Sequence, residues 1–263
     1  MRASATSSAD ARGSLARSAS VADVQRPIWV TVRGTMDAVA RHDPEVARAL
    51  FESEHAIALK GRDGAIHGLS WASVSEFERD LERRSIPQSV TVVMYDPEKW
   101  KQTPANEQRR PVPAMQRFGE LAKRHGYTSI ITPHPGLTSV EHSAFRRRDD
   151  ETEEDAYVRS GLTQAAARAA DIVETQAQRL QNDPENYRRV VAATAERARE
   201  ANPDVWVLSG LATQPGHVAT PEILLAAWES VRDVVDGHYL SLSNMKNPPV
   251  MARFLRLVLE RST

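Results

Sequence analysis

One pattern recurs along this sequence and limits the folds that it can adopt. A short run rich in β-branched residues is followed by a turn and then by a segment with helical periodicity. Nearly apolar strands that alternate with helices are typical of a parallel sheet covered by helices, so an α/β protein is expected. The strands predicted from these runs are 28–33, 56–60, 89–95, 127–132, 171–174, 204–209 and 238–242.

The segments between these runs show the spacing of helices that bury one face. Val112, Met115, Phe118 and Leu121 recur at three-residue steps, which places them on one side of a helix. Residues that commonly begin and end helices flank these segments, as in Thr220-Pro221. The predicted helices cover 33–54, 73–84, 113–125, 153–169, 184–201, 221–235 and 248–261.

Two arrangements fit this alternation, an open doubly wound sheet and a closed (β/α) barrel. The first predicted strand leads into Arg33-Gly34-Thr35, which lacks the three-glycine fingerprint of a dinucleotide site. Residues 1–25 are predicted to be a disordered tail, and residues 26–263 a single domain near the ~250 residues typical of an eight-unit barrel. We therefore predict a barrel of seven or eight parallel strands. Either an eighth strand is concealed around 65–69 or the barrel is incomplete.

Composition removes several classes of function. The chain has 34 Lys and Arg against 35 Asp and Glu, so it lacks the basic excess typical of nucleic-acid binding. It has no cysteine, which excludes disulfides, thiolate metal ligands and cysteine nucleophiles. No apolar run approaches the ~18 residues that span a bilayer, and the N-terminal segment lacks the apolar centre of a secretory signal. We expect a cytoplasmic protein that binds a small-molecule substrate, with no cofactor, nucleic acid or membrane partner.

Active sites of (β/α) barrels lie at the carboxyl ends of the strands, and the long predicted loops all follow strands. Asp96 and Glu98 end the third predicted strand two residues apart, so both can face the same side. Glu174 ends the fifth. Paired carboxylates can serve as general acid and as base or nucleophile, so Glu98 and Glu174 are predicted to do the acid–base or nucleophilic work, with Asp96 orienting them. The alternatives are a turn with a helix cap at Asp96-Pro97-Glu98 and, for Glu174, an ion pair with Arg33 or Lys60.

Other polar and aromatic side chains are placed at the same rim. His134 lies between two prolines that hold it rigidly, and we predict that it orients the catalytic carboxylates. A metal set of Asp96, His134, Glu174 and His217 is a second possibility, although it lacks a tight ligand spacing. The predicted substrate-binding residues are Tyr95, Arg33, Lys60, Gln176, Asn244 and Trp100.

From about Arg26 to its end, the chain resembles the TIM-barrel superfamily, in particular barrels of the glycoside hydrolase type. The resemblance rests on the architecture, on Asp96-x-Glu98, on Glu174 and on aromatic loop residues. Chitinase-like barrels carry a longer acidic run before Asp-x-Glu, where this chain is apolar. The resemblance implies a metal-independent hydrolase or lyase that uses carboxylate acid–base chemistry on a small polar substrate, which could be a glycoside. A metal-dependent isomerase or lyase and a non-catalytic ligand-binding barrel are the alternatives.

Overall fold

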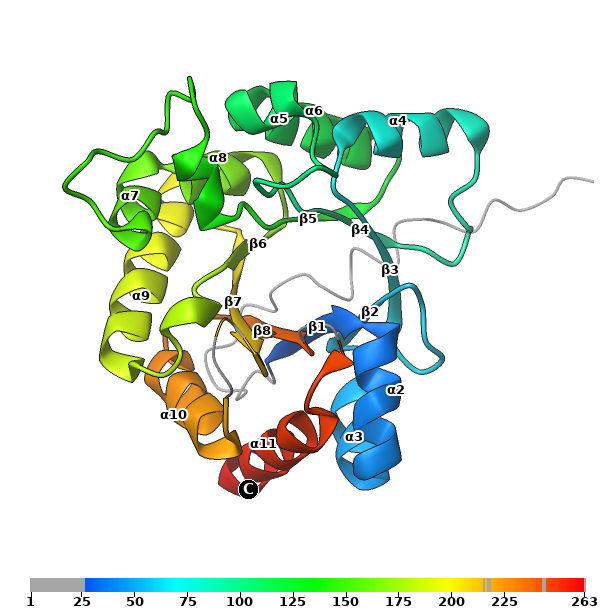
Figure 1. Cartoon of the computed structure of the whole chain (residues 1–263). Coiled ribbons are helices and arrows are strands. Elements are labelled where there is room, and N and C mark those ends of the chain that lie inside the picture. Colours follow the sequence, from blue (N-terminus) through cyan, green and yellow to red (C-terminus); the bar gives the residue numbers. More distant parts are fainter. Residues whose placement is uncertain (1–26, 215, 217–218, 243–244, 263) are drawn as a thin grey trace, which may run out of the picture.

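The protein folds as a closed barrel of parallel strands. A computed structural model describes residues 27–262 except 215, 217–218 and 243–244. Eight strands follow one another around the barrel in chain order, and β1 closes it by pairing with β8 (Figure 1). This confirms the predicted TIM-type barrel, and the concealed strand expected around 65–69 is β3. The strands are β1 (Ile28–Val32), β2 (Ala56–Leu59), β3 (Ile66–Trp71), β4 (Val92–Tyr95), β5 (Thr128–Ile131), β6 (Ile172–Thr175), β7 (Trp206–Ala212) and β8 (Gly237–Ser241).

Helices surround the barrel on its outside (Figure 1). None in the described part of the chain is long and apolar enough to cross a membrane. They are α2 (Arg33–His42), α3 (Pro44–Phe51), α4 (Val74–Arg83), α5 (Ala105–Arg109), α6 (Pro111–Arg124), α7 (Glu153–Ser160), α8 (Leu162–Ala169), α9 (Pro184–Ala201), α10 (Pro221–Val231) and α11 (Pro248–Ser262), with 3-10 turns η1 (Pro135–Ser139) and η2 (Gln178–Leu180).

Two predicted helices are each divided in the structure. The first breaks at Asp43, whose carboxylate accepts a hydrogen bond from the Val46 N–H at 3.1 Å and caps α3. Pro44 then begins α3, where a proline needs no hydrogen-bond partner for its nitrogen. The second breaks at Gly161, which has a φ of 74° and separates α7 from α8. A left-handed residue ends a helix, and glycine adopts that conformation at little cost.

The connection between β2 and β3 departs from a regular (β/α) barrel. Residues 60–65, all described, join these parallel strands without a helix, although such crossovers usually take a dozen residues or more. The turn uses left-handed conformations at Lys60 and Gly61, with φ of 75° and 68°. The outer face of β3 is left partly uncovered at His67 and Leu69, and a groove of about 510 Å³ lies there. We call it the outer groove.

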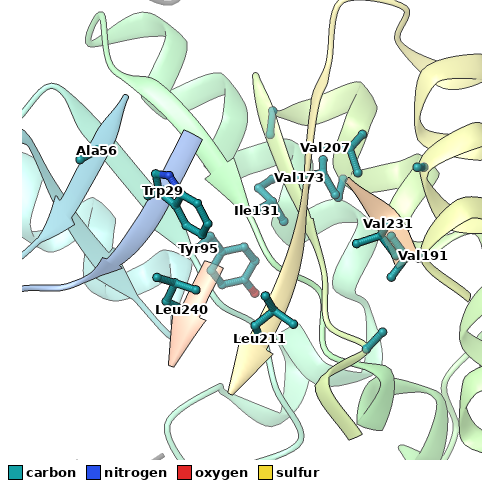
Figure 2. Close-up of a cluster of buried hydrophobic side chains, with 14 of the residues drawn as sticks. Trp29, Ala56, Tyr95, Ile131, Val173, Val191, Val207, Leu211, Val231 and Leu240 are labelled. Carbon is teal, nitrogen blue, oxygen red and sulfur yellow. The ribbon is translucent and has the colours of Figure 1, made fainter. Parts of the chain in front are cut away.

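Alternation along the strands divides the core into two layers. One fills the inside of the barrel and includes Val30, Met94 and Leu208. The other lies between the strands and the helices (Figure 2); its residues include Trp29, Tyr95, Ile131, Val173, Val207, Leu211 and Leu240. Successive residues of a strand point to opposite faces, so this division shows which side chains at each strand end face the inside of the barrel.

Gly119 allows α6 to lie against the end of α8. An added Cβ would lie 1.9 Å from the backbone oxygen of Ala169. We expect Gly119→Ala to destabilise the protein by about 1–3 kcal/mol, because a backbone atom cannot move aside as a side chain can. Urea denaturation measures the change. Gly34→Ala is the control, since its nearest contacts are the end of the Met245 side chain at 3.5 Å. Equal stability of the two variants would contradict this explanation.

Candidate functional site

The register of β4, β5 and β6 places three polar residues in one layer inside the barrel. The backbone partners across these strands, Tyr95, Ile131 and Val173, all pack outward. The next residues, Asp96, Thr132 and Glu174, therefore point inward at the carboxyl ends of their strands. Two strand spacings of about 4.8 Å put the Cα atoms of Asp96 and Glu174 about 10 Å apart. The fold thus gathers the acidic groups that the sequence placed at separate strand ends.

Asp96 is half-buried and is held by two hydrogen bonds from neighbouring strand ends. Its Oδ1 accepts from Thr132 Oγ1 at 2.7 Å and from Gln176 Nε2 at 3.1 Å. Burial raises the pKa of Asp96 to about 6, while the bonds from Thr132 and Gln176 act in the opposite direction. Asp96 is therefore mostly ionised at neutral pH.

Glu98 lies in the loop after β4, and within the described part of the chain its carboxylate lacks hydrogen bonds like those that Asp96 receives. Its backbone N–H donates to Thr103 Oγ1 at 3.2 Å, but its half-buried carboxylate makes no hydrogen bond or ion pair with any described residue. Burial, followed by the charge of Asp96, raises the pKa of Glu98 to about 7. A carboxyl group in this state can give up or take a proton near neutral pH.

Glu174 lies deeper than the other two carboxyl groups and is only 1% exposed. Its Oε1 accepts a hydrogen bond from Gln178 Nε2 at 3.2 Å. Gly210 on β7 leaves room for it, because a Cβ there would lie 2.5 Å from the same oxygen. Burial, with smaller effects from the charges of Asp96 and Glu98, raises the pKa of Glu174 well above its usual value. We call Asp96, Glu98 and Glu174 the carboxyl cluster.

Tyr239 on β8 also faces the carboxyl cluster, and the sequence interpretation missed it. Its ring packs against the apolar layer inside the barrel, and its hydroxyl makes no hydrogen bond with the described residues. Burial, and then the charges of Glu174, Asp96 and Glu98, raise the pKa of this hydroxyl. The alternation of β8 could have found it, since the buried Leu240 points outward and its neighbour must point inward.

His134 supports the loop that carries Glu98. Its backbone N–H donates to the Pro97 carbonyl at 3.1 Å, and its Nδ1 accepts from the Gly136 N–H at 2.9 Å. The neutral ring therefore carries its proton on Nε2. Burial is the largest effect on the pKa of His134 and lowers it. The contact of His134 with this loop is thus made through its backbone, and its predicted role in orienting the carboxylates stays a prediction.

The described residues of the alternative metal set do not come together as a metal site. No group of three or more His, Asp or Glu side chains among the described residues could hold a metal ion. His217, the fourth member of that set, lies outside the described residues, as does Asn244. The ring nitrogen Nδ1 of His134 is already occupied by the Gly136 N–H.

Tyr95 was predicted to contact substrate, and this prediction is wrong. Its side chain is 0% exposed and points outward, away from the carboxyl cluster. Its hydroxyl donates to Glu107 Oε2 at 2.9 Å, and its ring stacks on Phe118 with 5.4 Å between centroids. The physical reason is strand alternation: if Asp96 faces inward, the residue before it must face the helices.

The other predicted binding residues are dispersed. Arg33 and Lys60 line the outer groove, where Arg33 pairs with Asp37 at 3.4 Å, and neither forms an ion pair with Glu174. Trp100 is 38% exposed in the loop after Glu98, and its Nε1 donates to Thr103 Oγ1 at 2.9 Å. Of the predicted binding side chains, the structure brings Gln176 to the carboxyl cluster, where it contacts Asp96.

The chain is similar, at low sequence identity, to several solved structures. Neither a protein-family model nor a curated protein matches the sequence. Similar solved structures include an α-L-fucosidase candidate from Bacteroides thetaiotaomicron (11% identity, 70% of this chain and 57% of that chain, TM-score 0.43). Another is a family GH18 chitinase catalytic domain from the fern Peteris ryukyuensis (15% identity, 78% of this chain and 71% of that chain, TM-score 0.44). A third is the carboxyl transferase domain of Rhizobium etli pyruvate carboxylase (11% identity, 89% of this chain and 46% of that chain, TM-score 0.41). The chain thus spans little more than half of the first and less than half of the third, and we assign no activity from these similarities.

The burial of Glu174 has a consequence for stability. The folded chain retains a proton that the unfolded chain releases above its ordinary pKa of 4.5, so stability falls as pH rises from there towards the raised pKa. We expect Glu174→Gln to lower the pH dependence by about 1.4 kcal/mol per pH unit, which is the share of one group, while the raised pKa values of Asp96 and Glu98 leave a residual slope. Urea denaturation between pH 5 and pH 8 measures it.

Glu196→Gln is the matched control for that experiment. Its side chain is exposed on α9 and makes no hydrogen bond or ion pair with the described residues, so the substitution should leave the pH dependence of stability as it is in the wild type. If Glu174→Gln has the same slope as the wild type, Glu174 does not retain its proton on folding.

Proposed function

We propose that this chain is a glycoside hydrolase that uses Glu98 as general acid and Asp96 as its ionised partner, without a metal ion. The observation that supports the proposal is the unequal treatment of two carboxyl groups two residues apart. Asp96 receives two hydrogen bonds that favour its charged form, whereas the Glu98 carboxylate receives none from the described residues. Environments that separate the pKa values of two neighbouring groups are typical of acid–base pairs.

In this proposal the protonated Glu98 donates its proton to the leaving-group oxygen as the glycosidic bond breaks. The Asp96 carboxylate stabilises the positive charge that develops at the anomeric carbon. Water then adds its hydroxide to that carbon, and its remaining proton returns to the carboxyl pair. The products are the free sugar and the alcohol of the leaving group, and the enzyme ends in its starting protonation state.

Glu174, Tyr239 and Trp100 have supporting roles in the proposal. Glu174 stays protonated beneath the pair, which prevents a third negative charge from accumulating in a poorly solvated site. Tyr239 faces the carboxyl cluster with an unused hydroxyl and replaces Tyr95 as the aromatic residue that contacts substrate. Trp100 offers an exposed ring beside Glu98, on which a sugar face can stack.

The pH dependence of hydrolysis tests the assignment. Asp96 must be ionised and Glu98 protonated, so we expect kcat/KM to rise through pH 6 and to fall above pH 7. A panel of 4-nitrophenyl glycosides supplies the substrates. Asp96→Asn and Glu98→Gln should each lose about 10²–10⁴-fold in kcat.

Glu174→Gln is the discriminating variant, because it replaces a protonated carboxyl with a neutral group of the same shape. It should retain far more activity than Asp96→Asn or Glu98→Gln. If it is as inactive as they are while remaining folded, Glu174 belongs to the chemistry and this division of roles is wrong. Tight binding of a sugar with no turnover in the wild type would favour the non-catalytic barrel.

A further inference from the structure

Gln176 lies two residues beyond Glu174 at the end of β6 and faces the same side of the sheet. Its Nε2 donates to Asp96 Oδ1 at 3.1 Å and to the backbone oxygen of Thr132 at 2.8 Å. A primary amide has two N–H groups, so both donors are used within the protein. Gln176 therefore has no donor left for a substrate, and the substrate-binding role predicted from the sequence would use its Oε1 as an acceptor.

The orientation of this amide is fixed by its partners. Both groups that face Nε2, a carboxylate and a carbonyl, are hydrogen-bond acceptors in every state in which Asp96 is ionised. Turning the amide over would bring its own oxygen against two other oxygens and lose both bonds. Gln176 thus ties β6 to the ends of β4 and β5 in a single arrangement.

Thr132 completes the contact from β5. Its hydroxyl donates to Asp96 Oδ1 at 2.7 Å, and its side chain is fully buried. Both hydrogen bonds therefore end on the same carboxylate oxygen of Asp96. The other oxygen, Oδ2, makes no hydrogen bond with the described residues and is the one that remains for a substrate.

We infer that Gln176 and Thr132 are positioning residues, which together keep Asp96 ionised and turn its Oδ2 towards the substrate. We call the two residues the Asp96 clamp. This inference rests on the proposed function for its catalytic meaning, but the clamp itself is a statement about one carboxylate and can be tested without a substrate.

The surroundings of Asp96 leave the clamp as the source of its stabilisation. Burial disfavours the charge, and the described groups that lower the pKa of Asp96 are the Thr132 hydroxyl and the Gln176 amide. The titratable groups facing it bring no positive charge. They are Glu98 from its own loop, Glu174 from β6 and Tyr239 from β8, while His134 from the β5 loop carries a lowered pKa and is neutral near pH 7. The Tyr95 side chain on β4 points away from Asp96, towards the helices.

The test is a carboxyl titration by NMR of the full chain labelled with ¹³C at the aspartate Cγ and glutamate Cδ atoms. Asp96→Asn and Glu98→Gln assign the two signals. Gln176→Met and Thr132→Val each remove one donor while keeping the shape of the side chain. We expect each substitution to raise the pKa of Asp96 by about one unit or more. The pKa of Glu98 should fall in the same variants, because the neighbouring negative charge of Asp96 is lost.

Two matched variants separate positioning from general disturbance. Thr132→Ser restores a hydroxyl and should restore the wild-type titration of Asp96. Gln178→Met removes an amide that donates to Glu174 instead and should leave the Asp96 signal in place. Circular dichroism and thermal denaturation confirm that each variant is folded.

The outcomes distinguish the two proposals. If Asp96 titrates higher in both clamp variants and the acid limb of kcat/KM moves by the same amount, both proposals are supported. If the NMR shift occurs but no variant, including the wild type, hydrolyses a glycoside, the clamp stands and the proposed function is wrong. If Asp96 titrates as in the wild type in folded Gln176→Met and Thr132→Val, or if Gln178→Met has the same effect as they do, the clamp is overturned.

Discussion

Closure of the parallel hydrogen-bond ladder determines which side chains of this protein can meet. Each strand is paired on both sides, so no strand can slip by one residue without breaking two ladders. Such a slip in β4 would place Asp96 among the helices and Tyr95 inside the barrel. The aromatic contacts of Tyr95 with Phe118 and its bond to Glu107 therefore help to keep Asp96 facing inward.

The apolar layer inside the barrel gives the carboxyl cluster its chemical character. Met94, Ile130, Ile172 and Leu208 pack inside the barrel at positions just before or beside the acidic residues. Carboxyl groups above such a layer lose water on one side, and the charged form loses most. Burying these carboxyl groups destabilises the fold at neutral pH, and the extensive core between strands and helices offsets this cost.

Much of the fold follows from sequence patterns, and what they missed has physical reasons. Seven strands are visible as short, mostly apolar runs, but β3 contains Gly68 and two polar residues and follows a turn without a helix, so its pattern is weak. The split falls at Gly161, and the sequence does not show that this glycine adopts the left-handed backbone that ends α7. Asp96 and Glu174 were found because strand ends of a barrel converge on one face.

Contacts that depend on exact geometry were beyond the sequence. The Gln176 amide meets a carboxylate 80 positions away, and no spacing rule selects it over a substrate-binding role. Arg33 and Lys60 also follow strands, yet they line the outer groove that exists because β2 and β3 lack a helix between them. The orientations of Tyr95 and Tyr239, in contrast, can be predicted from the sequence. Strand alternation alone turns Tyr95 towards the helices and Tyr239 towards the inside of the barrel.

The nature of the donors explains how two carboxyl groups so close together can differ. A guanidinium or ammonium group acts over several ångströms and would lower the pKa of all three members of the carboxyl cluster. A hydroxyl or amide donor acts mainly on the oxygen that it touches. Thr132 and Gln176 are neutral donors, and both touch Asp96. They can therefore lower the proton affinity of Asp96 without lowering that of Glu98, whereas the charge of Asp96 raises the pKa of Glu98. The same two contacts thus favour the ionised form of one residue and, through its charge, the protonated form of the other.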